Sequence, residues 1–569
     1  MEKLTRSAST VWKTLLGVLA SGCLLLAGAA REGAGAAARA SVIVQGRDAA
    51  ALADHVRAGG GEVTHELGII GAVAARLTPA QRQSLERRCA GCRFYYDRTV
   101  AGAGGAASDA VALGILAPNT AVPRQVGAPA LWARGVTGAG VAIAVVDTSA
   151  SFFLPGLWGD RNDGWRVHAY YDAIADVLCR VRQREPGCPM DDHGHGTHVA
   201  GVALSSAVTA SGDYAGVAPD AGLVVVRALD ERGRGTYADV IRGIDWVVRH
   251  RVEHGIGVLN LSFSAAPRSY YWDDPLNQAV MAAWQAGIVV VTSAGNTGPD
   301  PMTIGVPGNV PYVITVGAVA DASTPDDPDD DYLLSYSASG PTVEGFVKPE
   351  LVAPGDLVVS TMSPAAALYK DYPEYRAGRW HFRMSGTSQA AAAVSGVAAL
   401  MLQVRPELTP DDVKCRLMAA ARPAVDPVAG QLAYAVFQQG AGAVDAQAAV
   451  LSTLSGCANA GLDVGKDLAD GEHYAGPARV DAEGRFYVPG VGYAWDGLYE
   501  PAGGPWTDGW PWVDAWLQGD GWPWVDAVRW TDDVDLHEES LVDGVPWVDG
   551  VPWVDGVPWV DGVPGGFSR

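Results

Sequence analysis

The sequence predicts an α/β fold built on a mainly parallel central sheet. Two nearly continuous apolar runs, at residues 141–146 and 288–291, have the length and composition of strands buried on both faces, which is typical of parallel sheets. Each run leads to a polar side chain, Asp147 after the first and Asn296 after the second. Open α/β sheets carry their chemistry beyond the carboxyl ends of the strands, so both side chains are functional candidates, although both residue types are also ordinary turn formers.

The length and net charge of the chain limit the classes of protein to which it can belong. With 569 residues, the chain exceeds one ordinary domain, so we expect a large domain with smaller appendages. The formal net charge is −23, and residues 461–569, with 21 acidic and 5 basic side chains, account for 16 of these negative charges. Binding of nucleic acid needs a basic face, and none is evident, so no nucleic-acid partner is expected.

Residues 1–30 have the organisation of a secretory signal peptide. Basic residues occur up to Lys13, an apolar run covers residues 15–30, and the run ends in small residues. The run is shorter than the roughly 20 residues that span a bilayer, so no stable membrane anchor is expected, although a retained anchor is the alternative. A lipoprotein signal at Cys23 is disfavoured, because residues 24–26 continue the apolar run. We therefore expect a secreted protein.

The number of cysteines is consistent with a protein that is exported from the cell. Six cysteines follow the signal segment, and an even number in an exported chain favours disulfides over metal ligation. Cys179 and Cys188 close a short loop and form the expected pair, which would stabilise the fold by roughly 2 to 3 kcal/mol. The Cys89 and Cys92 pair lacks a second pair for zinc, so a local bridge is expected there. The pairing of the remaining cysteines stays open.

Residues 40–100 predict a small α+β module. The apolar pattern gives the order strand, helix, strand, strand, helix, strand, with the second helix opened by Thr78 and Pro79. This order is that of a ferredoxin-like module. Residues 101–122 read as a linker, because their first part is rich in glycine and alanine. A folded piece between a signal and a large domain suggests a removable prodomain, and an accessory domain is the alternative.

Three histidines occur within residues 191–201, at His193, His195 and His198. Histidine clusters can bind zinc, but these alternate with small residues at the start of a predicted helix, without the companion residues of a zinc motif. A single histidine acting as a general base needs a carboxylate to orient it and a nearby hydroxyl to deprotonate. Asp147 and Ser388 are the candidates for these two partners.

Ser388 opens a long apolar segment. The run Gly386-Thr387-Ser388-Gln389-Ala390 precedes small apolar residues up to position 402, which predicts a helix that starts close to Ser388. A hydroxyl at this position lies among unpaired backbone N–H groups, where a developing oxyanion would be stabilised. A serine before an alanine-rich helix is also an ordinary N-cap, so both interpretations remain.

The segments 145–148, 195–201 and 386–388 resemble the three signature blocks of subtilisin-like serine proteases. The resemblance runs from about residue 126 to 450 and implies a three-layer α/β/α domain over residues 123–453. It implies a catalytic triad of Asp147, His195 and Ser388, in the same chain order as in subtilisin. His193 and His198 would then be bystanders, and the segment 152–188 would be an insertion able to wall the cleft.

The same resemblance places the substrate. It implies that Asn296 donates to the oxyanion together with the Ser388 amide. The expected substrate-binding residues lie in three loops or strands: Gly233 and Gly235, then Ser262, Phe263 and Ser264, then Ala294 and Gly295. The family usually has glycine where this chain has Ser264, so the rim of the specificity pocket is expected to be altered. The chain also lacks the proline that commonly follows the serine block.

Partners and cofactors follow from this interpretation. Protein or peptide substrates are expected, with the prodomain as an intramolecular inhibitor. The chemistry requires no cofactor and no metal. The acidic loop 326–331 suits structural calcium, because calcium prefers oxygen ligands, but a solvated acidic loop is the alternative, and no ligand is assigned. The oligomeric state is not predicted.

The tail, residues 454–569, is rich in Gly, Asp, Trp and Pro. A hexapeptide repeats at residues 544–561, and an extended chain would place Trp547, Trp553 and Trp559 on one side. Such a ladder suits glycan stacking or docking, but a low-complexity segment without a fixed fold is the expected state. A catalytically silent surface or glycan-binding protein that uses this tail is the alternative function.

Overall fold

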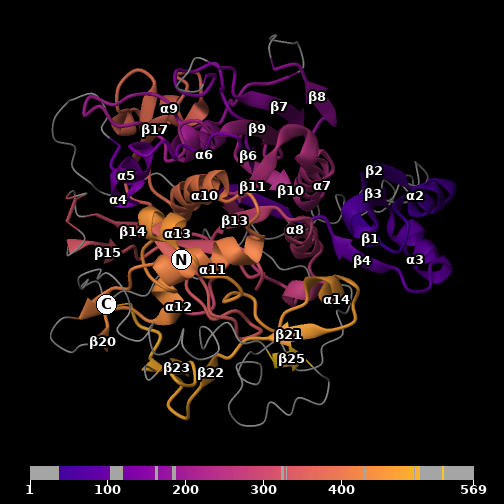
Figure 1. Cartoon of the computed structure of the whole chain (residues 1–569). Helices are drawn as coiled ribbons and strands as arrows, with labels where there is room; N and C mark the ends of the chain where they lie inside the picture. Colours follow the sequence, from indigo (N-terminus) through magenta and orange to yellow (C-terminus); the bar gives the residue numbers. More distant parts are fainter. Residues whose placement is uncertain are drawn as a thin grey trace, which may run out of the picture.

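The computed structural model describes residues 38–102, 120–159, 164–181, 188–321, 324, 326–327, 330–426, 431–491, 494–499 and 528–530. The predicted signal segment, most of the predicted linker and the repeats at 544–561 lie outside the described residues. Figure 1 shows a large central body, a small module of residues 40–96 at its side, and the chain beyond residue 455 along its lower edge.

Within the described residues, a nine-stranded sheet forms the centre of the large body. The strand order is β15-β14-β13-β11-β6-β9-β7-β8, and β16 also pairs with β14. The pairs from β14 to β7 are parallel, whereas the outer pairs β14–β15 and β7–β8 are antiparallel. The strands are β6 (Ala142–Asp147), β7 (Val167–Asp172), β8 (Val177–Cys179), β9 (Gly222–Arg227), β11 (Ile256–Leu261), β13 (Val289–Ser293), β14 (Ile314–Ala320), β15 (Tyr332–Leu333) and β16 (Leu351–Pro354).

The two apolar runs that predicted the sheet are its central strands. Every residue of β6 and of β13 is buried, because helices cover the sheet on both sides of these strands. Helices α6 (His195–Leu204) and α10 (Thr387–Val404) pack against each other and over β6 and β11. Helices α7 (Tyr237–His254) and α8 (Pro275–Gln285) also pack together and contact β11 and β13. This architecture fits the predicted three-layer α/β/α domain (Figure 1).

Helix α10 runs through the core of this domain. It is the one helix in the described part of the chain with the length and hydropathy of a membrane span, and 89% of that apolar window is buried inside the protein. Alanine and valine dominate its sequence, and these small side chains let α10 lie close to α6 and to the sheet. Further helices surround it: α4 (Val122–Gln125), α5 (Ala128–Trp132), α9 (Ala367–Asp371), α11 (Pro410–Ala420), α12 (Val436–Gln439) and α13 (Ala446–Leu451).

Part of the segment 152–188, which the sequence predicted as an insertion able to wall the cleft, belongs to the central sheet. Its residues 167–172 form β7, which pairs in parallel with β9 and extends the central sheet. The following strand, β8, returns antiparallel to β7 and ends at Cys179, which forms a disulfide with Cys188 as predicted. Cys89–Cys92 also forms the expected local bridge, and the two cysteines left open, Cys415 and Cys457, pair with each other.

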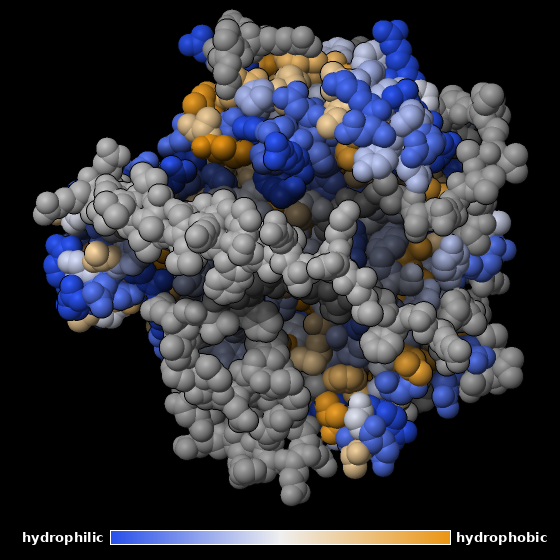
Figure 2. Space-filling view, turned by 180° about the vertical axis from the view of Figure 1, so that it is seen from behind, coloured by the Kyte–Doolittle hydropathy of each residue, from blue (hydrophilic) through white to orange (hydrophobic). Residues whose placement is uncertain are grey.

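The N-terminal module has the predicted succession of elements around its own apolar core. Its strands form an antiparallel sheet in the order β2-β3-β1-β4, the order of a ferredoxin-like module. The module contacts the large domain through β2, which faces α7, and through η1, which faces α8. Its outward surface is mainly hydrophilic (Figure 2). The elements are β1 (Ala40–Gln45), α2 (Ala49–Ala58), β2 (Glu62–Leu67), η1 (Gly68–Ile70), β3 (Ala72–Leu77), α3 (Pro79–Arg88) and β4 (Arg93–Tyr96).

The predicted boundary of a poorly ordered tail at residue 454 needs correction. Residues 456–491 and 494–499 fold onto the large domain, and we call this segment the C-terminal extension. Trp495 is buried and stacks on Phe437 of α12, with ring centroids 6.2 Å apart. The segment lacks the periodic apolar pattern from which a folded structure would be predicted. A few large buried aromatic side chains hold it to the domain instead. Its elements are α14 (Val464–Leu468), β21 (His473–Ala475), β22 (Arg479–Val480), β23 (Phe486–Tyr487) and β24 (Ala494–Trp495), and β21 also pairs with β25 (Val528–Trp530).

Candidate active site

An aspartate and a histidine meet at the carboxyl edge of the sheet. Asp147 is the last residue of β6, and His195 is the first residue of α6. The His195 Nδ1 atom lies 2.7 Å from Asp147 Oδ1, and both side chains are fully buried. The Thr148 backbone N–H donates to the same carboxylate oxygen at 2.7 Å. Because a carboxylate only accepts, this bond keeps the proton of the neutral ring on Nδ1 and leaves Nε2 as an acceptor.

Glycine at position 196 permits this close approach of helix and strand. A Cβ atom on Gly196 would lie 2.1 Å from the Ser149 carbonyl oxygen, which no side chain could tolerate. The backbone of Ser149 itself has a φ of 114°, a left-handed conformation that is uncommon for a residue other than glycine. The small residue after His195 is therefore a steric requirement of the Asp147–His195 contact.

Asp191 holds the first turn of α6 in place, a role that sequence reasoning missed. Its Oδ1 accepts from the Gly194 N–H at 2.7 Å and from the Thr148 hydroxyl at 2.9 Å. Its Oδ2 accepts from the Thr197 N–H at 2.8 Å and from the Thr197 hydroxyl at 2.6 Å. The carboxylate thus ties the end of β6 to the start of α6. An aspartate shortly before a helix start is a usual sign of capping and was the available signal.

The three histidines have different environments. Burial alone would lower the pKa of His195, but the charge and hydrogen bond of Asp147 raise its pKa above the ordinary value. Burial lowers the pKa of His198 to about 3, and its Nε2 lies 3.0 Å from the Val358 carbonyl oxygen. Burial, together with the neighbouring His195, also lowers the pKa of His193. Because His195 and His198 face separate partners, the cluster does not have the convergent geometry of a zinc site.

Ser388 lies in the first turn of α10, but its hydroxyl does not cap the helix. The N-cap is Gly386, which has no side chain, and the Ser388 hydroxyl donates to the Ser262 carbonyl oxygen at 3.0 Å. The Ser262 hydroxyl in turn donates to the Ser388 carbonyl oxygen at 3.0 Å. In the described part of the chain, His195 Nε2 and Asp147 Oδ2 have no hydrogen-bond partner.

The first turns of α6 and α10 nonetheless lie side by side. Gln389 Nε2, next to Ser388, lies 3.4 Å from His198 Nδ1, one turn after His195. The N-terminal ends of both helices therefore face the same edge of the sheet. The structure brings the Asp147–His195 pair and Ser388 to one region, with the serine hydroxyl turned toward Ser262 instead of toward the imidazole.

Asn296 follows β13 and is fixed against the start of α10. Its Oδ1 accepts from the Thr387 N–H at 3.0 Å and from the Thr387 hydroxyl at 2.9 Å. The Gly295 N–H lies 3.2 Å from the same hydroxyl oxygen. Because its oxygen faces α10, the orientation of the Asn296 amide group is set by Thr387. Sequence reasoning did not assign this role to Thr387, and its place beside Ser388 in the signature block was the available signal.

A short strand lies between the two predicted substrate-binding edges. Strand β5 (Thr99–Gly102) lies between β10 (Arg234–Thr236) and β12 (Phe263–Ser264) and pairs antiparallel with both. The Gly102 N–H donates to the Gly233 carbonyl oxygen at 3.0 Å. A Cβ atom on Gly102 would lie 3.4 Å from the His195 ring, so Gly102 covers the imidazole.

The beginning of the predicted linker therefore needs correction. Residues 101 and 102 belong to β5, and the large domain already begins with α4 at Val122. Gly102 is in van der Waals reach of the His195 ring, whereas Ala101 is exposed.

Two of the predicted pocket residues, Ser264 and Gly295, lie close to each other. The Ser264 hydroxyl lies 3.4 Å from the position that a Cβ atom on Gly295 would take, and at the same distance from such a position on Gly305. Ala294 packs with Ile304 and Ala338 in a small apolar cluster. Ser264 therefore lies between Gly295 and Gly305, and the altered rim of the specificity pocket stays a prediction.

The acidic loop does not form a cation site among its described residues. In the part of the chain described here, no group of three or more His, Cys, Asp or Glu side chains has the arrangement to hold a metal ion. Asp330 accepts from the Thr324 hydroxyl, and Asp326 pairs with Arg124 at 3.5 Å, so these carboxylates face separate partners. Burial and neighbouring aspartates raise the pKa of Asp331 to about 7. Asp329 lies outside the described residues, and structural calcium stays a prediction.

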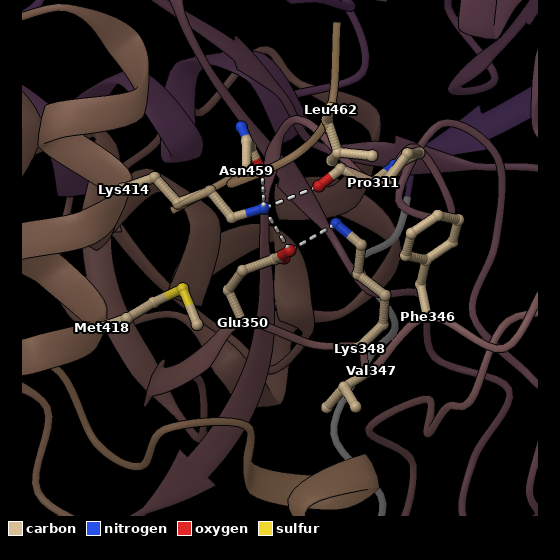
Figure 3. Close-up of a pocket in the computed structure, with 9 residues that line it drawn as sticks. All are labelled: Pro311, Phe346, Val347, Lys348, Glu350, Lys414, Met418, Asn459 and Leu462. Atoms are coloured by element: carbon tan, nitrogen blue, oxygen red, sulfur yellow. Dashed lines mark hydrogen bonds and ion pairs between the residues drawn. The ribbon is translucent and has the colours of Figure 1, made fainter. Parts of the chain in front are cut away.

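A second cluster of buried charge lies elsewhere in the domain (Figure 3). Glu350 Oε1 lies 2.6 Å from Lys348 Nζ and 2.8 Å from Lys414 Nζ, and all three side chains are buried. The Glu350 Oε2 atom accepts from the Thr315 N–H at 2.7 Å. Lys414 also donates to Asn459 at the start of the C-terminal extension, at 3.1 Å. A cavity of about 20 Å³ adjoins this cluster, and none of the predicted catalytic residues lines it.

Comparisons with known proteins agree with this geometry. Residues 138–443 match the subtilase family, peptidase family S8. The serine protease AprX of Bacillus subtilis (strain 168) is 38% identical over 351 residues, which cover 61% of this chain and 73% of AprX. The extracellular serine proteinase of Thermus sp. (strain Rt41A) is 34% identical over 295 residues, which cover 52% of this chain and 58% of that protein.

A solved structure shares the fold. Fervidolysin from Fervidobacterium pennivorans, described as a keratinolytic enzyme related to subtilisin, superposes with a TM-score of 0.57. The superposition covers 84% of this chain and 70% of fervidolysin at 20% sequence identity. At this identity, the likeness concerns the fold.

Proposed function

Because the chain belongs to the subtilase family and is a serine endopeptidase, we propose that it cleaves peptide bonds with Asp147, His195 and Ser388, assisted by Asn296. The observation that carries this assignment is the buried 2.7 Å contact of His195 with Asp147 at the sheet edge that also holds the start of α10. This pairing orients an imidazole with a free acceptor nitrogen, which is what activation of a serine hydroxyl requires.

The first half of the reaction forms an acyl-enzyme. The Ser388 hydroxyl turns from the Ser262 carbonyl toward His195 Nε2, which takes its proton as Oγ bonds to the substrate carbonyl carbon. The developing oxyanion is stabilised by the Asn296 amide and the Ser388 N–H at the positive end of α10. The imidazolium, held by Asp147, then gives its proton to the leaving amine as the peptide C–N bond breaks.

Water completes the cycle. His195 Nε2 takes a proton from a water molecule, whose oxygen attacks the acyl carbon, and the same proton returns to Ser388 Oγ as the ester bond breaks. Asp147 stays ionised throughout and keeps the ring in the tautomer that leaves Nε2 as the acceptor. Substrate binds in extended form between β10 and β12, with its side chain before the cut in the pocket whose rim includes Ser264.

The N-terminal module serves as the inhibitor of this site. Strand β5, which directly follows the module in the chain, lies between β10 and β12 in the extended, antiparallel form proposed for substrate. Gly102 lies against His195, so the bond to be cut lies C-terminal to Gly102 and before Thr120. We expect the enzyme to cut this bond in its own chain and to become active as the module leaves.

Export completes the proposal. Three disulfides fit an oxidising compartment. Residues 1–30 have the composition of a signal peptide, and one relative is described as an extracellular serine proteinase.

A fluorophosphonate probe tests the proposed nucleophile. We expect the probe to label the wild-type protein at Ser388 once the module has been removed, and not to label the Ser388→Ala variant. N-terminal sequencing of the secreted protein is expected to give a start within residues 103–120 for the wild type and an uncut chain for Ser388→Ala. A processed wild-type protein without labelling would instead favour the alternative of a catalytically silent surface-binding protein.

A further inference from the structure

The C-terminal extension is anchored to the large domain next to the N-terminal module. Asp467 of α14 is buried and accepts the hydroxyls of Tyr271 at 2.6 Å and of Tyr312 at 3.0 Å. The Tyr474 N–H of β21 donates to the Tyr271 hydroxyl oxygen at 3.2 Å. The short helix η2 (Tyr271–Asp273) of the large domain is thereby fixed beneath the extension. In Figure 1, α14 and β21 lie below the module.

A turn after α14 presents a carboxylate to the module. Asp470 adopts the left-handed conformation, with a φ of 59°, and its Oδ1 lies 3.1 Å from His473 Nε2. The other ring nitrogen of His473 lies 2.8 Å from Asp467 Oδ1, and the ring stacks on Trp272 with centroids 4.7 Å apart. Asp470 is therefore positioned by its neighbours, at a conformational cost that a freely solvated aspartate would not carry.

Arg93 of the module binds both the extension and the large domain. Its guanidinium forms an ion pair with the second oxygen of Asp470, and lies 3.7 Å from Asp273 of η2. Tyr95, two residues along β4, donates its hydroxyl to the same Asp273 at 3.1 Å. One edge of the module thus lies on a surface made jointly by η2 and the extension.

The net charges of the two partners are complementary. Residues 40–102 carry eight arginines against six carboxylates, whereas residues 456–499, which include the extension, carry seven carboxylates against three basic side chains. Opposite charges favour re-association of partners that have separated. An arginine that contacts two carboxylates from different segments is also held better than one in an isolated surface pair.

We propose that Asp273, Asp470 and the stacked Trp272 and His473 form a binding surface for the N-terminal module, through which the C-terminal extension prolongs inhibition after the chain is cut. This inference rests on the proposed function, in which the module inhibits the protease. The extension then sets how long the cut module stays on the enzyme, while β5 blocks the substrate-binding edges. The partner that this surface fits is a basic strand edge with an arginine and a tyrosine two residues apart, as in β4.

The lag before peptidase activity measures the lifetime of the inhibited complex. The full-length protein is allowed to cut itself, and hydrolysis of a fluorogenic peptide is then followed over time. Asp470→Asn keeps the size of the side chain and the tolerance of a left-handed turn, but removes the charge that faces Arg93. We expect Asp470→Asn and Arg93→Gln each to shorten the lag by about two- to fivefold, the range of partly exposed ion pairs, with no change in the final rate.

A double variant and a control variant at another arginine of the module complete the test. We expect the lag of Asp470→Asn combined with Arg93→Gln to be close to that of Arg93→Gln alone, because both changes break one contact. Arg57→Gln is the control, since Arg57 pairs with Glu66 at 2.9 Å inside the module. The final rate reports the folded fraction of each variant, and the two single changes test the pair from opposite sides.

Three outcomes distinguish the proposed role of the extension from the proposed inhibitor role of the module. If the wild-type protein shows a lag and both single variants show a shorter one, the result supports the proposed binding surface. A wild-type lag that neither variant changes overturns the role of the extension and leaves the inhibitor module standing. A cut wild-type protein without any lag overturns the inhibitor role, and the inference with it.

Discussion

Two clusters of buried charge in this protein differ in how completely their polar atoms are paired. In the Lys348, Glu350 and Lys414 cluster, both glutamate oxygens and both ammonium groups have hydrogen-bond partners (Figure 3). At the sheet edge, His195 Nε2 and Asp147 Oδ2 have none among the described residues. A buried polar atom without a partner costs free energy of folding, so these two atoms do not stabilise the fold.

The pKa shifts in the two clusters also have opposite directions. Burial lowers the pKa of Lys348 to about 7, against the charge of Glu350 and together with the charge of Lys414. For His195, the carboxylate outweighs burial and raises the pKa. The lysine cluster therefore joins residues 348–350 to Thr315, Lys414 and Asn459, whereas the Asp147–His195 pair holds the proposed base. Changes in the first should act on stability, and changes in the second on turnover.

The largest expected effect is that of Ser388→Ala on turnover. We expect cutting of its own chain to slow by about 10⁶-fold, the size found for this residue in subtilisin, because no other hydroxyl can replace the nucleophile. The free energy of unfolding should change by about 1 kcal/mol or less, since one neutral hydrogen bond to Ser262 is lost. Mass spectrometry of the processed fraction and denaturant unfolding of the uncut chain measure the two quantities.

Glu350→Gln should show the opposite pattern. In the Ser388→Ala background, which prevents self-digestion, we expect a loss of about 3 to 5 kcal/mol in the free energy of unfolding, because two buried ammonium groups lose their counter-charge. With Ser388 intact, turnover per folded molecule should stay unchanged. Glu407→Gln is the matched control, because its partner Arg405 is 3.9 Å away and both side chains are exposed. Equal losses in the two variants would contradict the role given to Glu350.

Asn296→Ala should reduce kcat by about 10²- to 10³-fold, the range known for the oxyanion residue of subtilisin. KM should change little, because the amide binds a charge that develops only in the transition state. Steady-state kinetics with a fluorogenic peptide measure both constants. A matched rise in KM without a fall in kcat would show that Asn296 binds substrate instead of the transition state.

The strands and two of the proposed catalytic residues could be predicted from sequence because their signals are local. The run before Asp147 is apolar on both faces, and it is buried on both faces in β6. His195 could be selected among three histidines through the signature block. The partners that fix the site, Asp191 and Thr387, act through space on other segments, and no local pattern distinguishes them from ordinary caps.

Two segments were wrongly predicted to be flexible because their amino-acid composition is poor in periodic apolar residues. Glycine and alanine at residues 101 and 102 predicted a linker, yet both residues belong to β5, which pairs with β10 and β12. The extension beyond residue 455 lacks apolar periodicity, yet single anchors such as Trp495 and Asp467 hold it in place. The direction of the Ser388 hydroxyl depends on the Ser262 carbonyl, 126 residues away in sequence, and no sequence pattern reports it.

The acid limb of the pH profile gives the smallest effect, about tenfold per pH unit, and tests the direction of the His195 shift. The base must be neutral, so the rate falls as pH drops through its pKa, which Asp147 raises above 6.5. Departure of β5 uncovers the ring and weakens the burial that lowers this pKa, so the free enzyme should keep a midpoint above 6.5. Measurement of kcat/KM between pH 5 and 9 gives the midpoint. A midpoint below 6 would mean that burial outweighs Asp147 and that the pairing does not prepare His195 as a base.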